Sequence, residues 1–140
     1  MTCFTEKGQK KNSIGDEFMN VRIDKKGNSK VAVIESPDIL INNTQDALDL
    51  MATIRHMYDC DKMVVNKSSV IESFFDLKTG IAGEILQKYT NYNMKIAMVG
   101  DFESYTSKSL KDFIYESNKG SQVFFLGDEK EAIERLHEAK

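Results

Sequence analysis

Residues 79–100 read TGIAGEILQKYTNYNMKIAMVG, and this stretch decides the fold class. Its first part places apolar side chains three and four residues apart, the spacing of one helix face: Ile81, Ala82, Ile85, Leu86 and Tyr89. Its second part, residues 95–99, is a short apolar run ended by glycine, which indicates a buried strand. A helix that leads directly into a buried strand is typical of an α/β fold.

The same alternation continues on both sides of this stretch. Short strands are predicted at residues 20–24, 30–36, 62–66 and 122–126, and the KKGN turn at 25–28 makes a hairpin of the first two. Further helices are predicted from Asn43 or Thr44 to Tyr58, near 107–117, and from Asp128 onward. The order β-β-α-β-α-β-α-β-α predicts an α/β fold with a mainly parallel sheet, a leading β-hairpin and four helices.

Residues 1–19, MTCFTEKGQKKNSIGDEFM, show neither helical nor strand period. Such a polar segment buries too little apolar surface to offset the entropy lost on ordering. We expect residues 1–19 to be a flexible leader or a non-native remnant, with Met19 as the natural start. Residues 20–140 are expected to form a single domain of ordinary size.

Composition narrows the classes of partner. The 140 residues are 41% hydrophobic and 29% charged with net charge -3, and the lysines lie scattered among acids, which argues against nucleic acid. The two cysteines, Cys3 and Cys60, lie outside any CxxC motif and predict no disulfide framework. No apolar run approaches the roughly 18 residues of a membrane span, and no signal peptide opens the chain. We therefore expect a cytoplasmic protein without a membrane partner.

Metal and nucleophile motifs are missing from the sequence. The two histidines, His56 and His137, lie on different predicted helices, and there is no HExxH, paired CxxC or EF-hand loop. His56 and Cys60 are four residues apart, but a helix C-terminus disfavours a thiolate, so we expect a structural or exposed pair. GxSxG is absent, and neither histidine follows a strand as a Ser-His-Asp set would need. We predict no catalytic residues, metal or cofactor.

The segment GDFESYTSKS, residues 100–109, leaves a predicted strand and enters a helix whose apolar side is expected to bury Leu110, Phe113 and Ile114. In a parallel sheet this loop lies at the carboxyl edge, where ligands usually bind. It is not a Walker A loop, and serines before a helix also serve as caps. The hydroxyl groups of this segment therefore either cap the helix or form an anion or ligand site. The candidate ligand edge comprises Asn66, Lys67, Asp101, Ser104 and Lys108.

The segment FFDLKTGIAGEIL, residues 74–86, raises a second choice. The oxygen of Asp76 or Thr79 suits a cap for the following helix. Gly80 and Gly83 fall on nearly one side of that helix, where they allow another backbone or a partner to approach closely. The segment is therefore either a helix start with tight packing or an accessible contact site.

A family resemblance bears on this choice. Two leading strands followed by αβ units, with an acid-hydroxyl-glycine turn opening the second helix, look like the STAS fold of anti-sigma-factor antagonists and sulfate-transporter tails. In those antagonists an Asp-Ser-Ser-Gly-Leu turn carries a regulatory phosphoserine. Here the turn has one extra residue and no double serine, and Thr79 best matches the phosphoserine position. The resemblance implies a phospho-acceptor or partner-contact site at Asp76, Lys78, Thr79 and Gly80.

At closer range, residues 20–138 resemble a small bacterial family of STAS-like domains, the domain-of-unknown-function family DUF4180. The matching motifs are ALDLMATI, FFDLKTGIAGEILQKY, KIAMVGDF and YTSKSLKDFIYESN. This resemblance implies a fold and no established activity.

Three functional hypotheses follow from the sequence. The first is a non-enzymatic regulatory or protein-binding module with a protein partner, because no complete catalytic set is present. The alternative is a small α/β ligand- or anion-binding domain, or an enzyme, that uses the carboxyl edge of the sheet. The third is a structural domain that forms a homo-oligomer.

Overall fold

The computed structural model describes residues 19–139. The sheet contains β1 (Asn20–Lys26), β2 (Ser29–Glu35), β3 (Lys62–Asn66), β4 (Lys95–Val99) and β5 (Val123–Leu126). The α-helices are α2 (Thr44–Tyr58), α3 (Ile81–Asn91), α4 (Lys108–Lys119) and α5 (Glu129–Glu138). The predicted α/β class, with its leading hairpin and four helices, is confirmed within these residues. Apart from Met19, which packs against the core, the predicted leader with Cys3 lies outside them.

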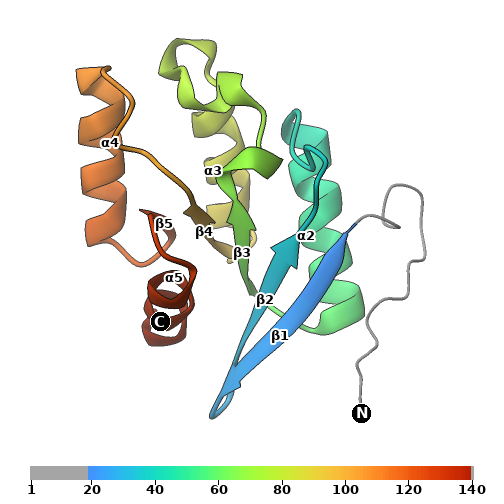
Figure 1. Cartoon of the computed structure of the whole chain (residues 1–140). Helices are drawn as coiled ribbons and strands as arrows, with labels where there is room; N and C mark the ends of the chain where they lie inside the picture. Colours follow the sequence, from blue (N-terminus) through green and yellow to red (C-terminus); the bar gives the residue numbers. More distant parts are fainter. Residues whose placement is uncertain (1–18, 140) are drawn as a thin grey trace.

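The five strands follow one another across the sheet in chain order, β1-β2-β3-β4-β5. β1 pairs antiparallel with β2, and β2 to β5 are parallel. Because each crossover moves one strand in the same direction, right-handed connections put α2, α3 and α4 on one face of the sheet. These three helices stand side by side in Figure 1, and α5 lies apart from them.

Two apolar clusters fill the space on the two faces of the sheet. The larger includes Met63, Ile96 and Phe125 and packs against α2, α3 and α4. The smaller includes Val64 and Phe124 and packs against α5. Successive residues of a strand point to opposite faces, so a strand covered on both sides needs apolar residues at every position. This explains the continuous apolar runs in β3, β4 and β5.

Side-chain caps fix three of the helix starts. Asn43 accepts a hydrogen bond from the Asp46 N–H at the start of α2, and Asp128 accepts one from the Glu131 N–H at the start of α5, as the sequence predicts. Ser107 accepts from the Leu110 N–H and caps α4. At least one hydroxyl of the 100–109 segment therefore has the capping role.

The predicted burial of α4 needs a correction. Leu110 is buried, but Phe113 and Ile114 are only half-buried and pack at the border of the core. The physical reason is the position of α4, which packs on the edge strand β5. Part of its apolar face therefore extends past the sheet.

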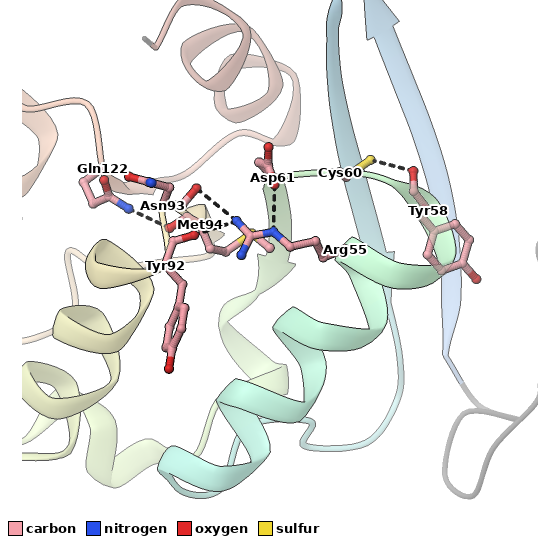
Figure 2. Close-up of polar contacts among 8 residues, drawn as sticks. All are labelled: Arg55, Tyr58, Cys60, Asp61, Tyr92, Asn93, Met94 and Gln122. Atoms are coloured by element: carbon pink, nitrogen blue, oxygen red, sulfur yellow. Dashed lines mark hydrogen bonds and ion pairs between the residues drawn. The ribbon is translucent and has the colours of Figure 1, made fainter.

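Arg55 ties three segments together at the amino edge of the sheet, as Figure 2 shows. Its Nε donates to Asp61 Oδ1 at 2.8 Å, and its Nη2 donates to the carbonyl oxygens of Tyr92 at 2.7 Å and Asn93 at 3.3 Å. The guanidinium thereby joins the end of α2 to the start of β3 and to the turn after α3. These Arg55 hydrogen bonds stabilise the amino edge of the sheet, which lies opposite the candidate site.

Candidate functional site

The carboxyl ends of the parallel strands meet at one edge of the sheet, and the segments that follow them form the candidate site. After β3 the chain makes three short 3₁₀ turns: η2 (Lys67–Ser69), η3 (Glu72–Phe75) and η4 (Leu77–Thr79). These turns lead into α3. After β4 the 100–107 loop passes beside them and leads into α4.

Aromatic packing holds the two segments together. Phe74 and Phe75 are buried, with their ring centroids 5.0 Å apart. Tyr105 of the loop stacks on Phe75 at 5.5 Å, and its hydroxyl donates to Glu72 Oε2 at 2.8 Å. Burial, together with this bond to the Glu72 carboxylate, raises the pKa of Tyr105. The tyrosine therefore keeps its proton further into alkali than a free tyrosine does, and its bond to Glu72 holds the loop against η3.

Local hydrogen bonds shape the turn between Asp76 and Gly80. Asp76 Oδ1 accepts from the Lys78 N–H and caps η4, not the long helix. Thr79 Oγ1 accepts from the Ile81 N–H at 3.2 Å and lies within donor reach of the carbonyl oxygens of Ser73 and Asp76. Gly80 occupies the N-cap position of α3. Asp76 therefore does not cap the long helix α3, so that prediction is wrong. Thr79 does accept from an N–H in the first turn of α3, although Gly80 and not Thr79 occupies the N-cap position.

The two glycines do not serve tight packing. A Cβ built at Gly80 or Gly83 meets nothing within 4 Å, so the predicted close approach of another backbone is wrong within this structure, and the approach of a partner stays a prediction. Gly80 has φ +80°, a conformation that side chains other than glycine rarely adopt, and this explains its presence. Nothing in the structure explains Gly83.

The predicted contact residues share one exposed surface. Asp76, Lys78, Thr79 and Gly80 are all exposed. Asp76 and Lys78 line an open hollow of about 540 Å³ together with Ser107 and Ser109 at the start of α4. We call Asp76, Lys78, Thr79 and Gly80, together with Ser107 and Ser109, the turn surface.

Lys67, from the predicted ligand edge, is held by packing. Its Cβ lies only 2.6 Å from where a Cβ on Gly100 would stand, so the lysine stem crosses the backbone at that glycine. Its Nζ lies 5.0 Å from the ring centroid of Tyr105 and 5.8 Å from that of Phe75. Lys67 therefore strengthens the contact between η3 and the loop.

The other members of that predicted edge are spread along it. Asn66 accepts from the Ser68 N–H, and Asp101 accepts from the Glu103 N–H. Lys108 pairs with Asp112 at 2.8 Å, and Ser104 is exposed. Of the five residues, Asp101 alone lines an open hollow of about 770 Å³ at this edge.

The structure also brings together a serine, a histidine and an aspartate that the sequence analysis did not place near one another. His137 Nδ1 lies 2.7 Å from Ser29 Oγ, and His137 Nε2 lies 2.8 Å from Asp24 Oδ1. Lys62 Nζ donates to the same serine oxygen at 2.9 Å. The sequence carries no local signal for this contact, because α5 crosses the second face of the sheet and its last turn ends over the hairpin, a contact across 108 residues.

This cluster fastens α5 to the hairpin. The His137 side chain is only 4% exposed, and Ser29 Oγ is engaged by both the imidazole and the Lys62 ammonium. Arg22 and Glu129 add an ion pair of 2.6 Å between β1 and the start of α5. We interpret the cluster as a structural clasp.

His56 and Cys60 have separate environments. Cys60 lies beyond the end of α2 and is 1% exposed, and its thiol donates to the Tyr58 carbonyl oxygen at 3.4 Å. Burial is the main cause that raises the pKa of Cys60 to about 11. The thiol is therefore protonated and inert at neutral pH. His56 is exposed.

Cys60 predicts a loss of stability in alkali. The unfolded thiol ionises near pH 9.0 and the folded thiol near pH 11, so the unfolded state holds fewer protons between these values. The free energy of unfolding should fall as pH rises through this window, and Cys60→Ala should flatten the fall. Urea denaturation of wild type and Cys60→Ala at pH 8 to 11 measures how the free energy of unfolding depends on pH. An equally steep fall in both proteins would contradict the prediction.

Two further observations concern the described residues 19–139. No group of three or more His, Cys, Asp or Glu side chains in this range is placed to hold a metal ion. No helix in the same range is long and apolar enough to cross a bilayer.

Within residues 19–139, fold and site define a small α/β domain with a five-stranded, mostly parallel sheet, three helices on one face and one on the other. Residues 26–136 match the family described as Domain of unknown function (DUF4180), and the chain belongs to that family. No curated protein matches the chain.

Proposed function

We propose that this chain is a non-enzymatic regulatory module of the cytoplasm that binds a protein partner through the turn surface. The observation that carries the proposal is that an exposed turn directly follows a segment anchored in the core. Phe74 and Phe75 are buried beneath the turn, whereas Asp76, Lys78, Thr79 and Gly80 are exposed. A contact surface held on a rigid scaffold loses little entropy on binding.

The chemistry of the turn surface suits a polar partner. It presents the Asp76 carboxylate, the Lys78 ammonium and the hydroxyls of Ser107 and Ser109 around one shallow hollow. Charged and hydroxyl groups at the rim of an interface give specificity and orientation. A partner that binds here needs complementary charges and hydrogen-bonding groups.

The STAS-like resemblance supports a regulatory role for Thr79. A phosphate on Oγ1 would remove the hydroxyl proton that bonds to the Ser73 or Asp76 carbonyl oxygen. The added charge of about -2 would lie beside the N-terminus of α3, a favourable position worth ~0.3–1 kcal/mol, with Lys78 as a neighbouring cation. The fold would survive while the turn surface became strongly acidic.

Substitutions at Thr79 test this proposal. Thr79→Glu should keep the fold and weaken partner capture, because it adds a negative charge to the turn surface. Thr79→Val should retain capture and lower the free energy of unfolding by ~1 kcal/mol, because the Ile81 N–H loses its acceptor. The measurement is quantitative capture from the native cell, with urea denaturation of each variant.

Intact-mass measurement of the native protein accompanies the capture experiment. A phosphorylated fraction located at Thr79 would support regulation there. Equal capture by wild type and both variants, with no phosphorylated species, would reduce the turn to an architectural role.

A further inference from the structure

The connections at the ends of β4 and β5 leave the sheet on opposite faces. β4 leads into α4, which packs with the larger cluster, whereas β5 leads into α5, which packs with the smaller one. In open α/β sheets such a divergence creates a crevice outside the carboxyl ends of the strands, where ligands bind. Gly100 and Gly127 directly follow the two strands at this point.

An open hollow of about 770 Å³ occupies this position. Its apolar lining comes from Phe102, Ile114 and Phe125. Asn118 also lines the hollow, but the nitrogen and the oxygen of its side-chain amide are both hydrogen-bonded to the Phe125 backbone. The volume and the apolar lining with few polar groups are typical of small-molecule sites.

The polar groups around the hollow set the charge of the ligand. Asp101, Glu103 and Lys111 line it with two negative charges and one positive charge. Within the described residues, the side chains of Glu103 and Lys111 have no hydrogen bond or ion pair. Tyr115, 65% exposed, also lines the hollow, and one face of its ring already carries a cation, because Lys119 Nζ lies 4.8 Å from the ring centroid. Carboxylates and aromatic rings attract cations, and carboxylates repel anions such as phosphate.

We propose that this hollow, which we call the switch-point hollow, binds a small organic ammonium ion with an aromatic or similarly flat apolar body. The body would lie on Phe102, Ile114 and Tyr115, and the ammonium would donate to the carboxylates of Asp101 and Glu103. The proposal does not depend on the turn surface, because Asp101 and Glu103 line this hollow and Thr79 does not.

Titration of the ¹⁵N-labelled full chain with phenethylammonium tests the proposal. We expect saturable shifts of the Gly100, Phe102, Tyr115 and Gly127 amide signals. 3-Phenylpropionate has a similar body with the opposite charge, and methylammonium has the charge without the body; both should bind more weakly. Glu103→Gln should weaken phenethylammonium binding roughly threefold to tenfold, since a charge-assisted hydrogen bond is lost at a solvent-open site.

Matched variants separate the site from general charge effects. Glu134→Gln removes an exposed carboxylate on α5 and should leave the affinity unchanged, as should Thr79→Glu. Tyr115→Ala removes an exposed ring and should weaken binding without loss of the fold. Three results would each overturn the proposal: no saturable shift, equal binding of 3-phenylpropionate, or equal effects of the Glu103 and Glu134 variants.

Discussion

Phe74→Ala is expected to lower the free energy of unfolding by roughly 3–5 kcal/mol, the usual cost of emptying a buried aromatic site. Phe74 is 1% exposed and lies in the larger apolar cluster, with its ring 5.0 Å from that of Phe75. η3 packs against α3, so the cavity would form directly beneath the turn surface. Urea denaturation followed by circular dichroism measures the loss.

Phe113→Ala is the matched control for Phe74→Ala. From the sequence alone this substitution is expected to cost roughly 3–5 kcal/mol, because the periodicity places Phe113 on the buried side of its helix. The structure corrects this value: Phe113 is half-buried, so the cost should be about 1–2 kcal/mol. Equal losses in the two variants would contradict the assigned burial.

Asn118→Ala is expected to cost roughly 2–4 kcal/mol, because two buried backbone groups would lose their partners. The Phe125 N–H donates to Asn118 Oδ1 at 2.8 Å, and Asn118 Nδ2 donates to the Phe125 carbonyl oxygen at 3.1 Å. β5 is an edge strand with the apolar sequence VFFL, and the amide side chain occupies the place of a neighbouring strand. Its loss should also promote self-association through the open edge.

Denaturation and sedimentation together measure both effects of Asn118→Ala. Asn91→Ala, at an exposed position of α3, is the control for the side-chain change itself and should have little effect. A monomeric Asn118→Ala protein with the stability of wild type would contradict the proposed sealing of the edge.

The fold was predictable because each element carries a strong local signal. The runs at 62–66 and 95–99 are apolar at their three central positions because both faces of the sheet are covered. Asn43 and Asp128 mark helix starts by their side-chain oxygens. The burial of Phe113 was not predictable. Periodicity identifies a helix face but does not show how far that face extends past an edge strand.

The candidate site was predictable only where neighbours in sequence form it. The exposed turn at residues 76–80 is formed by neighbours in sequence, and Gly80 provides the positive φ that this turn needs. The contact between Ser29 and His137 spans 108 residues and depends on the path of α5, for which the sequence carries no local signal. The switch-point hollow likewise depends on which face each connection takes.

Photo-crosslinking from position 78 tests the proposed partner surface most directly. A photoreactive residue replaces Lys78 in the full chain, expressed in the native cell, and the same residue replaces Lys88, which is exposed on α3, as the control. We predict one discrete heavier species from position 78 that is absent from position 88 and is lost when Thr79→Glu is added. No discrete species from position 78, or the same species from both positions, would contradict a protein-binding role for the turn surface.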